Sequence, residues 1–303
     1  MVYPDYYPEF SCIAGACKHS CCIGWEIDVD EEALARFSKV EGELGQRLQE
    51  NISMEDVPHF KLKEGERCPF LNGDGLCDLI LELGEETLCE ICEKHPRFYN
   101  WFADHTEVGL GLCCEEAGRL ILSRTEPVHL TGDLPEEPDG MFLLREELFG
   151  IAQDRSKPIS RRAEGLLAYV GAVLPGKSTA EWADFLLHLE RLDEAWTERL
   201  ERLKEPVDLD GFDTYMAARQ TEYEQFLVYL LYRHLSEAVD PFDLAGRTAF
   251  AVWGYELLRK LGAAVWTDAG AFSFEEQVEL ARLFSSELEY SDENLDLILE
   301  QLY

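Results

Sequence analysis

The chain has 303 residues, 46% of them hydrophobic, and a formal net charge of −34 from 61 Asp and Glu against 27 Lys and Arg. A chain of this length and apolar content can bury its own core, so it needs no disulfide framework to fold. The negative charge argues against nucleic acid and anionic membranes as partners. It would attract a cationic partner such as an exposed lysine on another protein, although a solvated surface that favours solubility explains most of the charge.

The N-terminal residues and the hydropathy pattern predict a cytoplasmic protein. Residues 1–10 lack the basic start and the apolar run of a signal peptide. No apolar stretch approaches the roughly 20 residues of a membrane span, so we expect no membrane partner. In a reducing compartment, clustered cysteines favour metal binding over structural disulfides or inert buried thiols.

All ten cysteines fall within the first 114 residues, which predicts a bounded metal-binding region. The expected metal ligands are Cys12, Cys17, Cys21, Cys22, Cys68, Cys77, Cys89, Cys92, Cys113 and Cys114. Thiolates select zinc, Cu(I) or iron–sulfur clusters. Only Cys89-x2-Cys92 has the regular spacing of a zinc pair, whereas an iron–sulfur cluster tolerates less regular spacing, so both remain open. His19 and His95 are candidate nitrogen ligands or ordinary structural histidines.

The first part of the chain reads as a cysteine-rich domain with little strand. Alternation over residues 24–29 suggests a short strand, and apolar residues at helical spacing predict one helix over residues 33–48. A turn at residues 72–75 should bring Cys68 and Cys77 toward each other. Cys89 and Cys92 fall on a short helix that ends before Pro96, so both thiols can face one metal.

Beyond residue 140 the pattern is helical. Three prolines between acidic residues over 123–140 predict a linker, which divides the chain into a metal-binding domain, residues 1–124, and a helical domain, residues 141–303. Helices are expected over residues 178–203, 215–235, 247–261, 274–288 and 292–302. The predicted fold is therefore mainly α, with a cysteine-rich metal-binding N-terminal domain followed by a C-terminal helical bundle.

Three segments carry a resemblance to a known family. They are Phe10-Ser-Cys12-x4-Cys17-x3-Cys21-Cys22-x-Gly24-Trp25, Arg67-Cys68-Pro69-Phe70-Leu71 with Gly75-Leu76-Cys77, and Leu83-Gly84-Glu85-Glu86-x2-Cys89-x2-Cys92-x3-Pro96-Arg97. With them, residues 8–122 resemble the flagellin lysine N-methylases, which belong to the cysteine-cluster proteins with a CxxCxxCC-like signature. The resemblance implies methyl transfer from S-adenosylmethionine to lysine side chains of flagellin, together with an iron–sulfur cluster.

The residues themselves show no familiar S-adenosylmethionine motif. Gly109-Leu-Gly111 lacks the rest of the glycine-rich turn that a Rossmann-type methyltransferase would show. Cys17-x3-Cys21 begins the C-x3-C-x2-C spacing of radical S-adenosylmethionine enzymes, but Gly24 stands where the third cysteine is needed. If S-adenosylmethionine binds, our hypothesis is that a cluster iron with an open coordination position holds it. Aromatic residues beside the cysteines, together with one arginine, are the expected cofactor-binding residues, with ordinary core packing as the alternative. They are Trp25, Arg97, Tyr99 and Trp101; no catalytic residue is assigned.

Two functions remain open from the sequence. The first is a protein-lysine N-methyltransferase that acts on flagellin or another lysine-bearing protein. The second is a non-catalytic zinc or iron–sulfur protein that binds a partner through its helical half. Binding of S-adenosylmethionine separates them.

Overall fold

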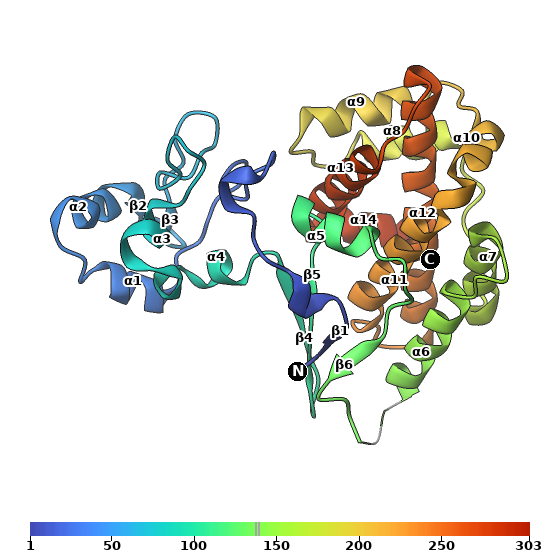
Figure 1. Ribbon diagram of the computed structural model, residues 1–303, viewed down its shortest axis with the longest axis horizontal. Coiled ribbons are helices and arrows are strands. Elements are labelled where there is room, and N and C mark those ends of the chain that lie inside the picture. Colours follow the sequence, from blue (N-terminus) through green and yellow to red (C-terminus); the bar gives the residue numbers. More distant parts are fainter. Residues whose placement is uncertain (137, 139) are drawn as a thin grey trace. The chain divides into compact units, whose positions relative to one another are not determined.

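The computed structural model describes residues 1–136, 138 and 140–303 (Figure 1). Helices account for 56% of the chain and strands for 9%, which confirms the prediction of a mainly α protein. Contacts divide the chain into two compact units. The smaller unit is Ser11–Phe98, and the larger unit combines Met1–Phe10 with Tyr99–Tyr303.

The smaller unit consists of short helices and two-residue strands. Its elements are η2 (Ala14–Ala16), α1 (Glu31–Phe37), α2 (Gly42–Asn51), β2 (Ile52–Ser53), β3 (His59–Phe60), α3 (Asp78–Leu83), η3 (Glu85–Thr87) and α4 (Glu90–Lys94). The prediction of a single helix over residues 33–48 is wrong. One helix ends at Phe37 and a second begins at Gly42, which takes a positive φ of 78° that a continuous helix does not allow. Where a strand was predicted over residues 24–29, the structure has an isolated bridge between Asp28 and His59.

The larger unit places helices around a four-stranded sheet. The strands are β1 (Val2–Pro4), β4 (Arg97–Trp101), β5 (Thr106–Leu110) and β6 (Leu130–Gly132), in the order β4-β5-β1-β6, and the first two residues of β4 are counted with the smaller unit. Strand β1 runs parallel to β5, with Val2 opposite Glu107, and antiparallel to β6. The β6 strand lies inside the stretch that we predicted to be a linker, and β1 joins the larger unit. The compact units therefore divide the chain elsewhere than at the predicted boundary of residues 125–140.

The helices of the larger unit are numerous and mostly short. They are η1 (Tyr7–Glu9), α5 (Glu115–Leu122), α6 (Gly140–Ala152), α7 (Ile159–Val170), α8 (Thr179–Leu186), α9 (Glu194–Arg202), α10 (Leu209–Tyr215), η4 (Met216–Arg219), α11 (Gln220–Leu235), α12 (Pro241–Ala269), α13 (Phe274–Phe284), the π-helix η5 (Ser285–Glu289) and α14 (Asp292–Leu302). The helix predicted over residues 178–203 is two helices, since Asp193 caps a new helix, α9.

The core of the larger unit lies along α11 and α12, which run side by side (Figure 1). Helix α11 is buried on nearly all sides, and the Tyr232 hydroxyl at its end donates to the Val108 carbonyl oxygen at 3.1 Å, which ties the helix to the sheet. Within the part of the chain that the structure describes, no helix is both long and apolar enough to cross a membrane.

Candidate functional site

Five cysteines gather around the apolar core of the smaller unit. Cys68 and Cys89 are buried within it, and Cys22, Cys77 and Cys92 pack against it from partly buried positions. Backbone contacts set these positions: the Cys68 amide donates to the Cys22 carbonyl oxygen at 2.8 Å, and Cys77 pairs with Leu71 across the turn at residues 72–75. Cys89 caps the N-terminus of α4, and Cys92 lies in that helix. We call these five residues the thiol core.

The thiols of this core influence one another electrostatically. A hydrogen bond from the Cys21 thiol, assisted by Ser20 and Arg67, lowers the pKa of Cys22 to about 7 although burial opposes it. Burial raises the pKa of Cys68 to about 12. A hydrogen bond between Cys92 and Cys89 raises the pKa of Cys92 and lowers that of Cys89. The thiol core is therefore only partly ionised at neutral pH unless a cation is bound.

The donor chemistry of the thiol core suits a soft metal, but its arrangement does not yet match one. Thiolates are the preferred ligands of zinc and of iron–sulfur clusters. Nevertheless, among residues 1–136, 138 and 140–303, no set of three or more His, Cys, Asp or Glu side chains is arranged to hold a metal ion. Metal binding at this core thus requires the side chains to turn toward a common centre.

The other predicted metal ligands lie outside the thiol core. Cys12 and Cys21 are exposed and Cys17 is half-buried, all three near the start of the smaller unit. Cys113 and Cys114 belong to the larger unit, in the turn between β5 and α5. The predicted group of ten thus divides between the two units.

The predicted cofactor-binding residues also divide. The Trp25 indole donates to the Cys21 carbonyl oxygen at 2.9 Å, and its ring lies 6.5 Å from that of His95. Burial and then the charge of Arg97 lower the pKa of His95 to about 4, so its imidazole is neutral, the form that binds metals. In the larger unit, the rings of Tyr99 and Trp101 stack 6.0 Å apart, and Trp101 is 74% exposed.

An acid-lined hollow of about 360 Å³ lies in the smaller unit, beside α1 and α4. It is lined by Asp30, Glu31, Glu32, Arg36, Glu86, Glu90, Glu93 and Lys94. Asp30 joins the two helices, because its carboxylate accepts the Ala33 amide at 2.8 Å and the Glu90 amide at 2.7 Å. The excess of carboxylates attracts a cationic side chain toward the helix that carries Cys92.

A buried polar network in the larger unit was not predicted from the sequence. Its centre is Glu289 at the end of the π-helix, whose carboxylate accepts from the Tyr229 hydroxyl at 2.9 Å and contacts His234 Nε2 at 2.7 Å and Arg233 Nε at 3.4 Å. Burial opposes the charge, but Arg233 and His234 outweigh it and hold the pKa of Glu289 at about 2. A π-helical turn of this kind often marks a functional position.

The Glu289 network extends to Cys113. The Leu112 amide donates to the Tyr229 hydroxyl at 3.3 Å, and Arg233 lies 4.6 Å from the centre of the Tyr290 ring. The Tyr290 hydroxyl is hydrogen-bonded to the Cys113 thiol, whose pKa burial raises to about 12. The network therefore holds the turn between β5 and α5. A sequence signal existed, since α11 carries several polar residues within a buried helix.

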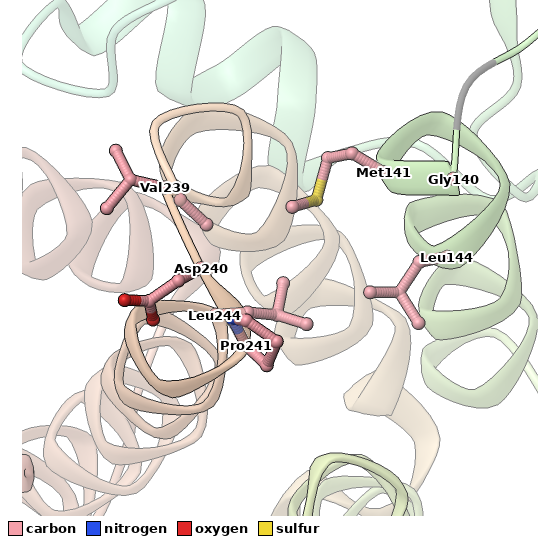
Figure 2. A pocket seen from close by; sticks show the side chains of 8 residues that line it. Gly140, Met141, Leu144, Val239, Asp240, Pro241 and Leu244 are labelled. Carbon is pink, nitrogen blue, oxygen red and sulfur yellow. The ribbon is translucent and has the colours of Figure 1, made fainter.

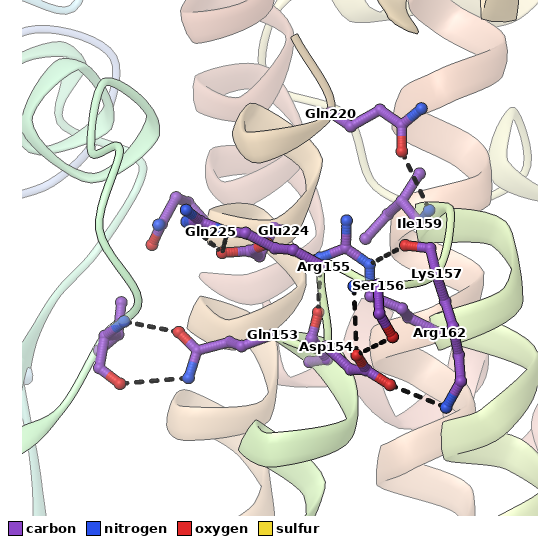
Figure 3. Close-up of polar contacts among 12 residues, drawn as sticks. Gln153, Asp154, Arg155, Ser156, Lys157, Ile159, Arg162, Gln220, Glu224 and Gln225 are labelled. Atoms are coloured by element: carbon purple, nitrogen blue, oxygen red, sulfur yellow. Dashed lines mark hydrogen bonds and ion pairs between the residues drawn. The ribbon is translucent and has the colours of Figure 1, made fainter. Parts of the chain in front are cut away.

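A second polar network ties α6 and α7 to α11 (Figure 3). Arg155 and Arg162 both donate to the fully buried carboxylate of Glu224, and the Gln153 side chain exchanges two hydrogen bonds with the backbone of Val128. Two guanidinium groups saturate one carboxylate, so this network is structural rather than catalytic.

A hollow of about 200 Å³ lies between the start of α6 and the start of α12 (Figure 2). Its lining is mostly apolar: Gly140, Met141, Leu144, Ala238, Val239, Asp240, Pro241 and Leu244. The carboxylate of Asp240 caps α12 by accepting from the Phe242 and Asp243 amides at 2.8 and 2.9 Å. The hollow therefore offers apolar surface and no spare acid–base group among its lining residues.

Known proteins resemble the helical part of the chain. Residues 169–303 match the family model described as the FliB lysine N-methylase C-terminal domain. The flagellar biosynthetic protein FliU of Salmonella muenchen is 28% identical over 134 residues, which cover 42% of this chain and 79% of that protein. The lysine-N-methylase of Salmonella typhimurium is 27% identical over 135 residues, which cover 42% of this chain and 34% of that protein. The lysine-N-methylase of Salmonella choleraesuis gives the same values.

The matched portion is thus about a third of the length of the two lysine-N-methylases. The family model covers the helical part, whereas the motifs quoted from the sequence lie in residues 8–122. No solved structure matches the chain.

Proposed function

We propose that the chain transfers methyl groups to lysine side chains of flagellin, and the premise is that residues 169–303 match the FliB lysine N-methylase C-terminal domain. The family match is the observation that carries the proposal. The net charge of −34 and the acid-lined hollow agree with a substrate that presents lysine ammonium groups.

The proposal includes S-adenosylmethionine as methyl donor and an iron–sulfur cluster, with zinc as the alternative. The residues that would hold the metal are those of the thiol core, because burial and mutual proximity set these five thiols apart from the exposed Cys12. When bound, a cluster with an open coordination position would supply a place for the amino and carboxylate groups of S-adenosylmethionine. The chain itself provides a neutral His95 beside Trp25 and the acidic surface that attracts the substrate.

Anaerobic purification followed by metal analysis and an absorption spectrum tests the cofactor. Iron with acid-labile sulfide and a broad band near ~400 nm is expected for a thiolate-ligated cluster. Zinc without iron would instead indicate a structural zinc site with no open coordination position, and it would refute the iron–sulfur cluster. Mass spectrometry of flagellin incubated with the loaded protein and S-adenosylmethionine then tests the activity, and a substrate without added methyl groups would refute it.

The thiol core is tested by matched serine variants. Cys89→Ser and Cys92→Ser should lose metal and destabilise the smaller unit, since metal binding contributes to folding when ligands are brought together by the fold. Cys12→Ser is the control, because this cysteine is exposed and outside the core. Equal metal content in all three variants would show that the ligands were assigned wrongly.

A non-catalytic metal-binding interaction module is the second candidate. It is favoured by exposed apolar side chains: Val239, which lines the hollow of Figure 2, is 87% exposed, and Phe242, which follows the lining residue Pro241 in the chain, is 65% exposed. Failure of the metal-loaded protein to bind S-adenosylmethionine would favour this module over the methyltransferase.

A further inference from the structure

The side chain of Lys177 is held by aromatic rings at the start of α8. Its Nζ atom lies 4.6 Å from the centre of the Trp182 ring and 5.3 Å from that of Phe185. The two rings are 5.8 Å apart and inclined at 79°, so they form two walls around the ammonium group. The same Nζ donates a hydrogen bond to Oε1 of Gln301 on α14.

These three partners have the chemistry that recognises a lysine side chain. Aromatic faces attract an alkylammonium group through their electron-rich centres, and Trp provides the strongest attraction of the ring types. The amide oxygen of Gln301 adds direction, because it accepts one N–H of the ammonium. Trp182 is only 5% exposed and packs 5.1 Å from the Trp253 ring, so this wall is rigid.

The segment that carries Lys177 packs loosely. Residues 171–178 join α7 to α8 without regular structure, and Val173 within this segment is 82% exposed. A Cβ atom added to Gly176 would meet nothing within 4 Å, so no other part of the structure packs against that side of the backbone next to Lys177. Helix α8 keeps its own start, since Ser178 and Glu181 form a capping box. The Lys177 side chain can therefore move away from the two rings without unfolding α8.

We propose that Trp182, Phe185 and Gln301 form a binding site for a lysine side chain of the protein substrate, which Lys177 occupies in this structure. The proposal rests on the proposed function, because the substrate it names is the lysine-bearing protein. Lys177 acts as a tethered competitor, and a residue on a short linker has an effective concentration in the millimolar range. A substrate lysine thus enters the site only when the Lys177 side chain leaves it, so Lys177 lowers the affinity of the site for the substrate.

Calorimetric titration of the full chain with Nα-acetyl-lysine amide tests the site. Lys177→Gln keeps a long polar side chain but removes the ammonium, and it should bind the probe at least about fivefold more tightly than the unaltered chain. Lys157→Gln, which removes a lysine that pairs with Asp154 instead, should bind like the unaltered chain. Equal affinity of Lys177→Gln and the unaltered chain would overturn the proposal.

Two double variants identify the walls of the site. Lys177→Gln with Phe185→Ala should lose the gain in affinity, and Lys177→Gln with Gln301→Ala provides the same test if the first variant does not fold. The Nε-trimethyl form of the probe should bind less tightly, because it has no N–H for Gln301; tighter binding of that form would refute the role of Gln301. The titration needs no methyl donor, so the two proposals can fail separately. Probe binding without flagellin methylation would reject only the proposed function, and flagellin methylation without probe binding would reject only this site.

Discussion

Replacing Glu289 by Gln should lower the stability of the larger unit, because it removes the buried carboxylate at the centre of the Glu289 network. Glu289 is 4% exposed and contacts Tyr229, Arg233 and His234. Its pKa of about 2, against an ordinary 4.5, corresponds to about 3 kcal/mol of stability at neutral pH. The uncharged side-chain amide of Gln cannot supply this stabilisation, and the charge of Arg233 then lacks its carboxylate partner.

The pH dependence follows from the direction of the pKa shift. Because the folded-state pKa is lowered, the contribution is fully present above pH about 4.5 and is lost as the pH falls toward about 2. The free energy of unfolding of the unaltered chain should therefore exceed that of Glu289→Gln by about 3 kcal/mol at neutral pH, and this difference should shrink steadily below pH about 4.5.

Urea unfolding, followed by tryptophan fluorescence in reducing buffer at neutral pH and at pH about 5, 4 and 3, measures this difference. Glu275→Gln is the matched control, since Glu275 is half-exposed and pairs with Arg119 at 2.9 Å, and it should cost at most about 1 kcal/mol. A difference between the unaltered chain and Glu289→Gln below about 0.5 kcal/mol, or one that does not change with pH, would contradict the proposed role of the Glu289 network.

Three further changes probe other parts of the chain. In metal-free protein, iodoacetamide at pH about 8 should modify Cys22 (pKa about 7) before Cys68 (about 12), and peptide mass spectrometry should detect the order. Arg145→Met should cost about 3–5 kcal/mol in urea unfolding, since the fully buried Glu107 carboxylate loses both hydrogen bonds from Arg145 and keeps the longer contact with His105 Nε2 at 3.4 Å; adding Glu107→Leu should recover part of the loss. Asp30→Ala should lower the stability of the smaller unit by about 1–2 kcal/mol relative to Glu31→Ala, because two backbone amides lose their acceptor; equal melting temperatures would argue against this link between α1 and α4.

The Lys177 site and the hollow of Figure 2 show how differently two surface features of the larger unit can be built. At Lys177, two rings and an amide oxygen converge on one ammonium group. In the hollow, the carboxylate of Asp240 is already used to cap α12. Only the first arrangement specifies a ligand by its chemistry.

Local sequence determined the features that depend on neighbouring residues. The helices expected to begin at residues 178 and 274 begin at Thr179 and Phe274, because the capping boxes of Ser178 and Ser273 satisfy the first helical amides with side chains within three residues. The helix predicted over residues 292–302 has the observed bounds of α14. The mainly α character follows from the same apolar spacing.

Tertiary structure decided which distant residues meet. The sequence shows ten cysteines in one N-terminal region, but packing buries Cys68 and Cys89 in the thiol core and assigns Cys113 to the larger unit. Glu289 lies more than fifty residues from Tyr229 and His234 in the chain, so no local pattern joins them. Only burial brings these groups together, because a buried charge is tolerated where the fold supplies its partners.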